Sequence, residues 1–468
     1  MEKIFEIEDK YGQVKDFRVN DVKIWPVYRI ILRFLLFRNR GEQTAEKTPT
    51  SSGITVLLKK VYRRSKHALR ILRELPDSHK WLRSYDCIVF SNDLEKREVN
   101  NVTIDKLATG LIEQLGEKRT LMVNYPSGNG SKKNRSLKHT VVDGQVIDTM
   151  ASLLRPAKAS ISAKDRQLMD QVLHEYQLSE DGLDQIDYFF RKARVIRSLL
   201  KKWKPRLVIN CCYTYQAEVF AAKNSGIRTV ELQHGIISPL HPGYDSALPI
   251  DKDFTAEFLL SFGENSTKNL SNNIVNLSNT IPVGNLYLEE VFNSPPDPFI
   301  QALVSRWEHS VCVPTDFITE EEILGFIIRL AEKDPRTGYL IVPRQDMFED
   351  SLDKISKIEN IKVLGGQSFQ NVVRHCTVHT ATISTCCLEA LSLGVPNILI
   401  NTDGRPRDFY GSLVDEKYTY FVSGADEYFL SLEKLKGYSK KEIRDSNYKN
   451  FSNGYRENLA RALKIIQS

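Results

Sequence analysis

From about Tyr85 onward, short runs of β-branched and apolar residues alternate with amphipathic helical stretches. Asp86–Asp93 and Arg119–Tyr125 are predicted strands, and Ile104–Leu115 is a predicted helix between them. An alternation of this kind is typical of a parallel sheet that is covered by helices. The sequence therefore predicts an α/β protein.

The alternation resumes after a mainly helical region that covers residues 163–203. Pro205–Cys212 and Ile227–Gln233 are predicted strands, and Ala217–Ser225 is a predicted helix between them. Ligands of open α/β sheets bind at the carboxyl ends of the strands. The polar residues that follow Ile227–Gln233 are therefore candidates for a binding or catalytic site.

A second alternating series follows the proline-rich stretch Asn293–Phe299. Its expected elements are strand Ser310–Asp316, helix Glu320–Lys333, strand Gly338–Asp346, strand Asn360–Leu364, helix Phe369–Cys376, strand Thr377–Ile383, and a helix followed by a strand over Ser384–Asn401. Two α/β units with a linker near residues 285–305 result. We predict four regions: an N-terminal segment over residues 1–80, a first α/β domain over 81–285, a second over 286–450, and a closing helix over 451–468.

Hydrophobic residues make up 41% of the chain and charged residues 26%, as in soluble globular enzymes. The charge is uneven, because the run Val56–Arg73 holds seven Lys or Arg residues and no acidic residue. Two interpretations of this basic run stay open: a solvated helix that docks by one apolar stripe, or contact with an anionic membrane surface. Nucleic-acid binding is not expected, since no recognition module accompanies the run.

Ile24–Phe37 is the most apolar window of the chain. It is shorter than the roughly 18 to 20 residues that a membrane span needs, and Arg29 and Arg33 interrupt it. No secretory leader precedes it, so we expect a cytoplasmic protein, peripheral on the inner face of the cytoplasmic membrane if the basic run binds lipid. The seven cysteines have no CxxC spacing, so free thiols are expected and a disulfide framework or a zinc site is not.

The stretch Ser384–Ile400 has the chemistry of a nucleotide-binding turn. Ser384 and Thr385 precede a predicted helix, where hydroxyls and backbone N–H groups at the positive helix end can bind phosphate. Glu389 lies one turn further on the same face, where a carboxylate can accept hydrogen bonds from ribose hydroxyls. The alternative is structural, with Ser384 as a cap and Glu389 as an exposed helix residue. The stretch resembles the donor-nucleotide segment of GT-B glycosyltransferases, and this resemblance favours the functional interpretation.

A second motif, ELQHG, carries Gln233 and His234 at the end of a predicted strand and ahead of a turn rich in Pro and Gly. The imidazole of His234 is expected in the crevice at the strand ends, as a general base or as a hydrogen-bond donor. A structural role is the alternative for a lone histidine. His241 and Asp245 are weaker candidates to assist it. Together with the HPGY that follows, the motif resembles the Gln-His-Gly motif of bacterial surface-polysaccharide transferases, a GT-B group that includes teichoic-acid glycerophosphotransferases.

The resemblance covers about Pro205–Asn401, and residues 1–200 match no family. It includes FLLSFGEN over Phe258–Asn265, IPVGNLYLEE over Ile281–Glu290 and VCVPTD over Val311–Asp316. It implies a GT-B fold, in which two Rossmann-like domains face across a cleft, with an extra basic N-terminal segment here. It also implies that the second domain binds a nucleotide-sugar donor and the first domain binds the acceptor.

One departure bears on the donor. Many members of this group carry a His-Pro pair that contacts the donor phosphate, and this chain has Val-Pro-Arg ending at Arg344. Arg344 can replace the lost contact by a charge-assisted hydrogen bond. The missing histidine disfavours a CMP-sugar or CDP-glycerol donor. It leaves a nucleoside-diphosphate sugar as the expected donor.

Weaker candidates complete the predicted site. Gly263 and Glu264 are expected to line it from the first domain, and Gly366 lies in LGGQSF, which resembles the loop that holds the nucleotide base. Loop solvation is the alternative for each. The single DxD spacing, Asp251 and Asp253, does not end a strand, so we interpret it as a solvated loop and expect no metal.

The function expected from this resemblance is transfer of a sugar from a nucleotide donor to a growing bacterial surface polysaccharide of capsule or O-antigen type. The acceptor is expected to be a glycan or a lipid-linked glycan, and no cofactor is expected, because the nucleotide sugar is a substrate. Phosphate-loop, dinucleotide-binding, zinc-protease and serine-hydrolase motifs are absent from the sequence. A nucleotide-sugar 2-epimerase or a polyol-phosphate transferase of the same fold remains an alternative. So does a non-catalytic partner in a polysaccharide assembly complex.

Overall fold

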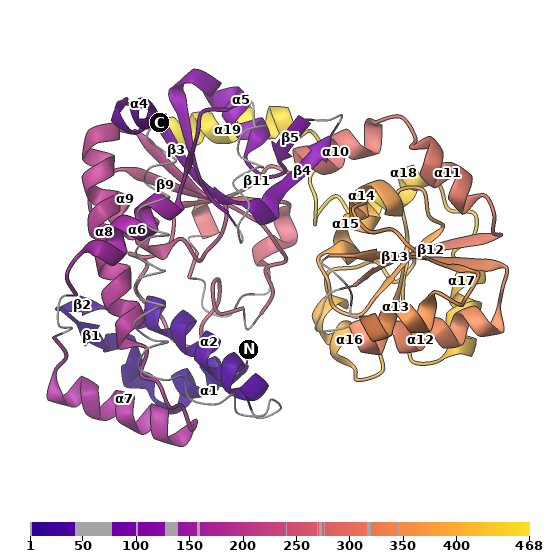
Figure 1. Ribbon diagram of the computed structural model, residues 1–468, viewed down its shortest axis with the longest axis horizontal. Coiled ribbons are helices and arrows are strands. Elements are labelled where there is room, and N and C mark those ends of the chain that lie inside the picture. Colours follow the sequence, from indigo (N-terminus) through magenta and orange to yellow (C-terminus); the bar gives the residue numbers. More distant parts are fainter. Residues whose placement is uncertain are drawn as a thin grey trace. The chain divides into compact units, whose positions relative to one another are not determined.

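The computed structural model describes residues 2–42, 77–99, 102–126, 139–156, 160–239, 241–268, 270, 274–275, 277–315, 320–344, 347 and 349–468. The basic run Val56–Arg73 lies outside the described residues. The chain forms two compact units, drawn in Figure 1. The first domain consists of Met1–Ser261, Thr267–Ile281 and Ala462–Ser468, and the second domain of Phe262–Ser266 and Pro282–Arg461.

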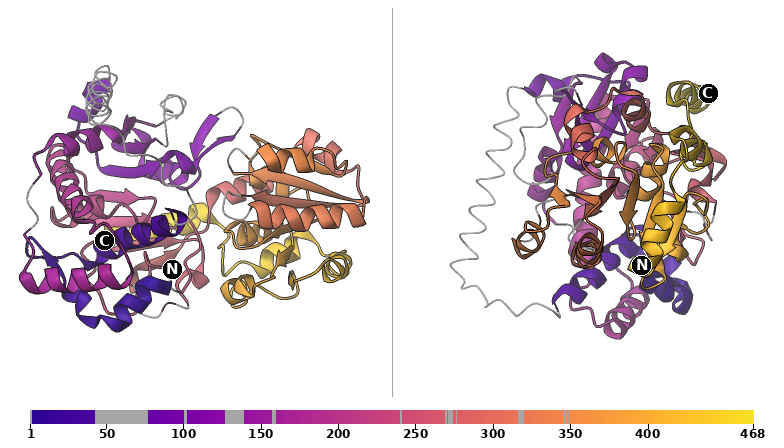
Figure 2. Two further views of the ribbon diagram at one scale, coloured as in Figure 1. Left: turned by 60° about the horizontal axis from the view of Figure 1, so that its bottom comes forward. Right: turned by 90° about the vertical axis from the view of Figure 1, so that its right-hand side faces the viewer.

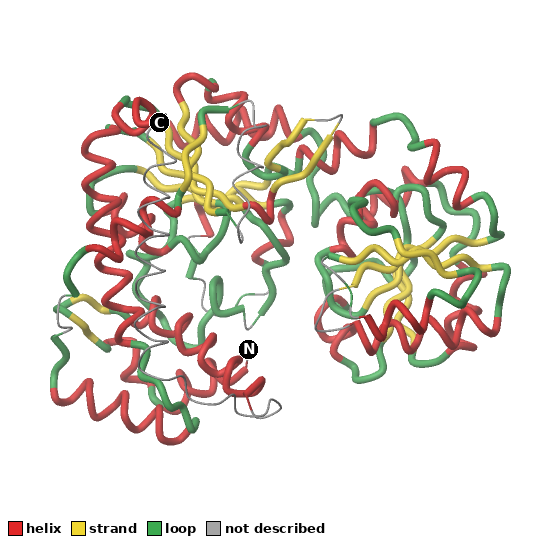
Figure 3. The backbone as a smooth tube through the Cα atoms, viewed as in Figure 1, coloured by secondary structure: helices red, strands yellow, loops and turns green. Residues whose placement is uncertain are grey.

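The first domain is built on a seven-stranded sheet, whose strands are yellow in Figure 3. In spatial order the strands are β11 (Thr280–Pro282), β10 (Phe258–Ser261), β9 (Arg228–Leu232), β8 (Leu207–Asn210), β3 (Cys87–Asn92), β6 (Thr120–Tyr125) and β7 (Val141–Asp143). The pairings from β10 to β7 are all parallel. The residues of β8 are buried on both faces, which explains why a strand of this sheet is apolar throughout.

The helices of the first domain include α4 (Ser78–Leu82), α5 (Thr109–Leu115), α6 (Gln145–Leu153), α7 (Ala163–Glu175), α8 (Leu183–Trp203) and α9 (Gln216–Lys223). The predicted helix Ile104–Leu115 is wrong at its start, because a hairpin of β4 (Lys96–Val99) and β5 (Val102–Asp105) comes first. The Asp105 carboxylate accepts hydrogen bonds from the backbone N–H groups of Leu107 and Ala108 and so ends the hairpin ahead of α5.

The N-terminal region folds as part of the first domain. It consists of α1 (Glu2–Lys10), the ribbon β1 (Arg18–Val19) with β2 (Val22–Lys23), and α2 (Trp25–Glu42). Figures 1 and 2 show α1 and α2 beside α7, and Lys10 of α1 pairs with Glu175 of α7. The apolar side chains of α1 and α2 belong to the same buried core as those of β3 and α8.

This packing includes most of the apolar window Ile24–Phe37. Most of its apolar side chains fill the core of the first domain and are not free for a membrane, although Phe34 and Phe37 are 58% and 62% exposed. No helix among the described residues is long and apolar enough to span a bilayer.

The second domain is built on a six-stranded parallel sheet. Its strands in spatial order are β14 (Ile361–Val363), β13 (Thr337–Pro343), β12 (His309–Thr315), β15 (Val378–Ala381), β16 (Asn397–Ile400) and β17 (Thr419–Val422). Its helices include α10 (Leu286–Asn293), α11 (Pro298–Val304), α12 (Glu320–Lys333), α13 (Glu349–Ile355), α14 (Phe369–Val373), α15 (Cys386–Ser392), α16 (Arg405–Tyr410), α17 (Ala425–Lys434) and α18 (Lys440–Ser446). Figure 1 shows α14, α15 and α18 on one face of this sheet and α12, α13 and α16 on the other.

Both sheets have the strand order of a doubly wound Rossmann fold. In the second domain the third, second and first strands are followed in space by the fourth, fifth and sixth. The first domain repeats this order, from β7 through β3 to β10, with β11 added at the edge. The prediction of two Rossmann-like domains, the units of which a GT-B fold consists, is therefore confirmed.

The chain returns to the first domain at its C-terminal helix. Helix α19 (Tyr455–Gln467) begins in the second domain, and its residues from Ala462 onward belong to the first. The Arg228 guanidinium of β9 donates a hydrogen bond to the Ile466 carbonyl, which ties the end of α19 to the first sheet. The predicted closing helix over residues 451–468 corresponds to α19.

Candidate functional site

The strand order locates a switch point in each sheet. In the first domain the chain winds from β3 to β6 and β7 on one side and from β8 to β9 and β10 on the other. In the second domain the corresponding pair is β12 and β15. A doubly wound sheet binds its ligand outside the carboxyl ends of the strands at this point. The residues after β3, β8 and β9, and those after β15, are therefore the candidates.

His234 follows β9 by two residues and is half-buried at the carboxyl end of the first sheet. Its Nδ1 lies 3.5 Å from the Tyr244 hydroxyl, and its Nε2 lies 3.7 Å from the Cys212 sulfur. Cys212 comes from the end of β8, so two neighbouring strand ends meet at this imidazole. The location predicted for His234 agrees with the structure.

A buried carboxylate stands behind His234. The Tyr244 hydroxyl donates a hydrogen bond of 2.5 Å to Glu231 of β9, and the Asn210 amide donates one of 3.3 Å to the other carboxylate oxygen. Burial raises the pKa of Glu231 to about 7, while the two hydrogen bonds oppose that shift. Burial also raises the pKa of Tyr244 well above its usual range, so the phenol keeps its proton. Glu231, Tyr244 and His234 thus form a chain of polar contacts from the core to the strand end.

Aromatic rings surround His234. The Tyr213 ring lies 5.8 Å from the His234 ring and 5.0 Å from the His241 ring, measured between centroids. Burial, Arg33 and His234 together lower the pKa of His241 to about 3. Its Nδ1 accepts a hydrogen bond from the Gly243 backbone, so His241 is a neutral structural group.

The N-terminal helices hold the loop that carries these residues. The described residues of this connection between β9 and β10 form neither helix nor strand in Figure 3. Arg29 of α2 is fully buried, pairs with Glu8 of α1 at 2.8 Å, and donates hydrogen bonds to the carbonyls of Pro242 and Asp245. The Glu8 carboxylate accepts a further one from the Ala247 backbone. Residues far away in sequence therefore fix the loop after His234.

Arg33, one turn further along α2, reaches the aromatic cluster directly. Its guanidinium donates a hydrogen bond of 2.8 Å to the Tyr213 hydroxyl. Asp245, which was expected to assist His234, is fully buried, and its side chain accepts a hydrogen bond from the Ser246 backbone. This contact, together with the hydrogen bond from Arg29 to its carbonyl, braces the loop.

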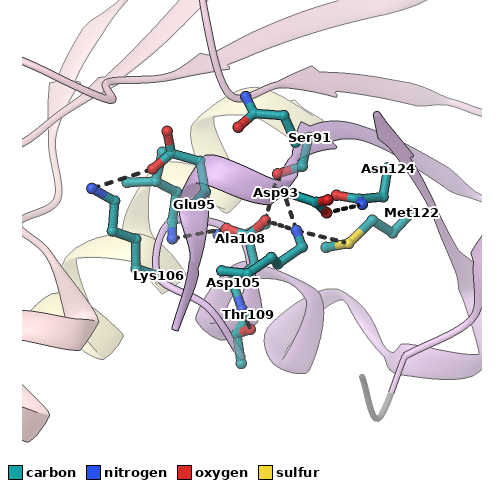
Figure 4. Close-up of polar contacts among 12 residues, drawn as sticks. Ser91, Asp93, Glu95, Asp105, Lys106, Ala108, Thr109, Met122 and Asn124 are labelled. Atoms are coloured by element: carbon teal, nitrogen blue, oxygen red, sulfur yellow. Dashed lines mark hydrogen bonds and ion pairs between the residues drawn. The ribbon is translucent and has the colours of Figure 1, made fainter. Parts of the chain in front are cut away.

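The end of β3 carries a second polar network, shown in Figure 4. The ammonium of Lys96 lies 2.5 Å from the Asp105 carboxylate, and both side chains are buried. Ser91 donates a hydrogen bond of 2.5 Å to the same carboxylate, and Asn124 at the end of β6 donates one of 2.7 Å to Asp93. Because these groups satisfy one another below the surface, the network stabilises the hairpin at the switch point.

Gln233, predicted with His234, turns its side chain back onto its own loop. It is buried, and its amide donates a hydrogen bond of 2.9 Å to the Gly235 carbonyl, while its backbone N–H pairs with Leu260 of β10. These contacts fix the backbone on either side of His234. Gln233 therefore shapes the turn that presents the imidazole.

In the second domain, Ser384 and Thr385 form the turn between β15 and α15, as predicted. The Ser384 hydroxyl accepts a hydrogen bond of 3.3 Å from the Cys386 backbone. The buried Tyr410 hydroxyl accepts one of 2.7 Å from the Ser384 backbone and donates one to the Ser384 carbonyl. The turn is half-buried and braced from below.

Glu389 is buried, and only 6% of it is exposed, which differs from the exposed helix residue considered as its structural alternative. The Gln370 amide of α14 donates a hydrogen bond of 2.6 Å to its carboxylate. Gln370 is itself buried, so this contact holds the carboxylate in one place next to the Ser384 turn. Gln370 had no distinguishing signal in the sequence.

The remaining candidates of the second domain lie at neighbouring strand ends. Arg344 follows β13 with an exposed side chain, and its backbone N–H pairs with Thr315 of β12. Gly366 lies in the exposed loop after β14 with a φ of +81°, a conformation that favours glycine. Both residues therefore sit at the carboxyl edge of the sheet that carries Ser384 and Thr385.

Gly263 has a packing role. A Cβ at this position would lie 2.3 Å from the Lys449 carbonyl oxygen, so the backbone approach requires glycine. Beside it the Phe262 ring stacks on the Phe451 ring with centroids 4.7 Å apart. This packing explains the Phe-Gly motif without a ligand. The Glu264 side chain is exposed next to it.

The DxD spacing and the cysteines agree with their predicted roles. The Asp251 carboxylate accepts a hydrogen bond from the Asp253 backbone in an exposed loop. All seven cysteines are free thiols, and five of them are buried. Among the described residues, Glu308, His309 and Glu433 bring potential metal ligands together, but the Lys436 ammonium already pairs with both carboxylates.

No model of a known protein family matches the sequence, and no curated protein matches it. Solved structures match at low identity. A UDP-GlcNAc 2-epimerase from Neisseria meningitidis bound to UDP-GlcNAc is 13% identical, with 81% of this chain and 99% of that chain covered and a TM-score of 0.48. A lipopolysaccharide outer core galactosyltransferase is also 13% identical, with the same coverage and a TM-score of 0.44. These similarities assign no activity to this chain.

Sequence reasoning missed the groups that surround His234. Glu231 carried a signal, because a carboxylate inside an apolar strand needs a buried partner. Glu8 and Arg29 carried a similar one, as charged residues within apolar helical faces. Tyr244 ends the HPGY of the motif but had no role assigned to it, and Cys212 had no signal that separates it from core residues.

Proposed function

We propose that this protein is a glycosyltransferase, which moves a sugar from a nucleoside-diphosphate donor to a growing bacterial surface polysaccharide. The donor binds to the second domain and the acceptor to the first. The enzyme acts in the cytoplasm, with a glycan or a lipid-linked glycan as acceptor. The nucleotide sugar is a substrate and no cofactor takes part.

The observation that carries the proposal is the turn after β15. It places Ser384 and Thr385 at the switch point of a Rossmann sheet, with the Glu389 carboxylate held beside it by Gln370. Hydroxyls at such a turn bind phosphate, and a fixed carboxylate accepts hydrogen bonds from a ribose. Arg344, exposed at the end of β13, adds a charge-assisted contact to the diphosphate.

His234 acts as the general base in this proposal. Its Nε2 accepts the proton of the acceptor hydroxyl while the acceptor oxygen bonds to the anomeric carbon. The bond from that carbon to the diphosphate breaks, and the diphosphate leaves with the electron pair. Positive groups and N–H donors at the Ser384 turn stabilise the charge on the departing diphosphate.

Binding of the donor tests the proposal most directly. We expect one class among UDP-, GDP-, dTDP-, ADP- and CMP-linked sugars to bind the wild type in calorimetry. Glu389→Gln keeps the shape of the side chain and an oxygen that can accept the hydrogen bond from Gln370. It should weaken binding of the nucleotide sugar by about tenfold or more, because a charge-assisted hydrogen bond to ribose is lost. Glu332→Gln on the exposed side of α12 is the matched control and should bind as the wild type does.

The products then distinguish the enzyme classes. Sugar transfer to a glycan acceptor supports the glycosyltransferase. An epimerised nucleotide sugar formed without acceptor would instead make the protein a 2-epimerase. If no nucleotide sugar binds, the donor site is wrong and the role of a non-catalytic assembly partner is favoured.

A further inference from the structure

The Glu231 side chain is an acid that the proposed reaction does not use directly. It lies in the core below His234 and is separated from it by one phenol. A buried carboxylate within an apolar strand is costly unless it is hydrogen-bonded. Its partners here, Tyr244 and Asn210, are themselves buried. The chain of contacts from Glu231 through Tyr244 ends at the His234 imidazole, on which Glu231 can therefore act.

We propose that Glu231 and Tyr244 are positioning residues that hold the proton of neutral His234 on Nδ1, so that Nε2 is unprotonated and can accept a proton. This inference rests on the proposed role of His234 as the general base. It adds the device that prepares the base before the acceptor binds.

The direction of the hydrogen bonds supports this assignment. An ionised Glu231 accepts only, so at 2.5 Å the Tyr244 hydroxyl must donate its one proton to the carboxylate. The phenol oxygen then has lone pairs left for the His234 Nδ1 at 3.5 Å, and that nitrogen must carry the hydrogen. A neutral imidazole with hydrogen on Nδ1 has an unprotonated Nε2.

The other side of the ring is compatible with this assignment, although a thiol can either donate to Nε2 or accept from it. The Cys212 sulfur lies 3.7 Å from Nε2. Burial raises the pKa of this thiol to about 12, so it stays an S–H group and a weak donor. A donor that faces Nε2 agrees with an unprotonated nitrogen there. The hydroxyl of a bound glycan acceptor is also a hydrogen-bond donor, and it can donate to Nε2 in place of the Cys212 thiol.

The state of Glu231 sets the pH at which the device works. Burial raises the pKa of Glu231 to about 7. Above this pH the ionised carboxylate accepts a hydrogen bond from the Tyr244 hydroxyl. Below it, a protonated Glu231 can donate to the phenol oxygen, which turns the phenol hydrogen toward Nδ1 and favours hydrogen on Nε2. The charged or titratable groups that face this chain of contacts are Glu95, Cys212, Tyr213, His241, Arg29 and Arg33.

The test is a spectroscopic measurement of the His234 tautomer in the full-length protein, made without substrate. Histidines are labelled with 15N, and the signal of His234 is assigned by its loss in His234→Gln. At pH 8 we expect the neutral imidazole to carry hydrogen on Nδ1 in the wild type. In Tyr244→Phe the hydrogen should redistribute toward Nε2. Tyr213→Phe, which removes a nearby phenol that does not bond to His234, should leave the tautomer unchanged.

Glu231→Gln provides a second variant that keeps the shape of the side chain. The fraction of neutral His234 with hydrogen on Nδ1 should change near pH 7 in the wild type, and this change should vanish in Glu231→Gln. Hydrogen on Nε2 in the wild type at pH 8, or an unchanged tautomer in a folded Tyr244→Phe or Glu231→Gln protein, overturns the proposal.

Activity is measured separately, so that the two proposals fail in different ways. With a nucleotide sugar that the enzyme transfers, Tyr244→Phe should lower kcat by more than about tenfold and leave KM nearly unchanged. The reason is that His234 then carries its hydrogen on Nε2 more often, while the substrates still bind. The expected tautomers without any sugar transfer would support the positioning role and count against the proposed function. Wrong tautomers with normal transfer would do the reverse.

Discussion

The two sheet ends hold their polar groups in different ways. At the end of the first sheet, His234 contacts Tyr244, which donates a hydrogen bond to Glu231. The loop after His234 is fixed by the buried pair of Glu8 and Arg29. At the end of the second sheet, the Ser384 turn is formed by residues adjacent in sequence. Its partners there are neutral groups such as Tyr410.

The difference shows how much of each end depends on distant parts of the chain. Buried charges at the first end come from α1, α2, the β4–β5 hairpin and β9, so stability and site geometry are coupled there. The second end is a local turn with one supporting helix. Changes at the first end should therefore affect folding strongly, and changes at the second should mainly affect binding.

The largest expected effect is that of Arg29→Met. It leaves the Glu8 carboxylate buried and unpaired, and it removes two hydrogen bonds to the loop after His234. We expect the free energy of unfolding to fall by about 3 to 5 kcal/mol, measured by urea denaturation. Lys10→Met removes an exposed ion pair with Glu175 and should lower the free energy of unfolding much less. Equal losses would contradict the bracing role of Arg29.

The next effect is a pH dependence due to Glu231. Since its pKa is raised to about 7 in the folded protein, its contribution to stability is full below the unfolded pKa and is lost as the pH rises through 7. From pH 4.5 to pH 8 the free energy of unfolding of the wild type should fall by about 3 kcal/mol because Glu231 ionises. This fall should be absent in Glu231→Gln. The exposed Glu257→Gln should keep the wild-type profile. The same profile in Glu231→Gln would show that this carboxyl titrates normally.

A smaller effect is expected from Gly263→Ala. The added Cβ would meet the Lys449 carbonyl oxygen at 2.3 Å, so the backbone must shift, at a cost of about 1 to 3 kcal/mol. Gly365→Ala adds a Cβ with no atom within 4 Å and should change stability by less than about 0.5 kcal/mol. Thermal unfolding of both variants measures the contrast. A Gly263→Ala protein of wild-type stability would return this glycine to the candidates for ligand binding.

The smallest effect on stability is expected at the Ser384 turn. Ser384→Ala removes one hydrogen bond, that from the Cys386 backbone, and should cost about 1 kcal/mol or less. Its affinity for the nucleotide sugar, measured by calorimetry, should fall while folding is preserved. Ser356→Ala at the exposed end of α13 is the matched control and should alter neither quantity by much. Undiminished affinity in Ser384→Ala would separate this hydroxyl from phosphate binding.

The periodicity of the sequence was sufficient for the α/β class and its two units, while the two Rossmann-like domains of a GT-B fold followed from the resemblance. Parallel strands such as β8 are buried on both faces and therefore appear as uninterrupted apolar runs. The β4–β5 hairpin was missed, because its strands have only four residues each and the Lys96–Asp105 pair that stabilises it joins the two ends of the hairpin. A pattern records neighbours along the chain and not such contacts.

In the candidate site, the parts that are local in sequence were predictable and the long-range contacts were not. Ser384 and Thr385 form a local turn, and the sequence located it. His234 was located as well, because a strand end fixes its place. Glu8 and Arg29 lie more than two hundred residues from the loop that they hold, so their partners follow only from the fold.

The path of α19 has a consequence for biosynthesis. Because residues from Ala462 onward belong to the first domain, a ribosome releases them only after the whole second domain has been made. During translation the Ile466 carbonyl becomes available to the Arg228 guanidinium of β9 only after the strands of both sheets have been made. A segment that is synthesised after the second domain is thus the one that completes the first domain.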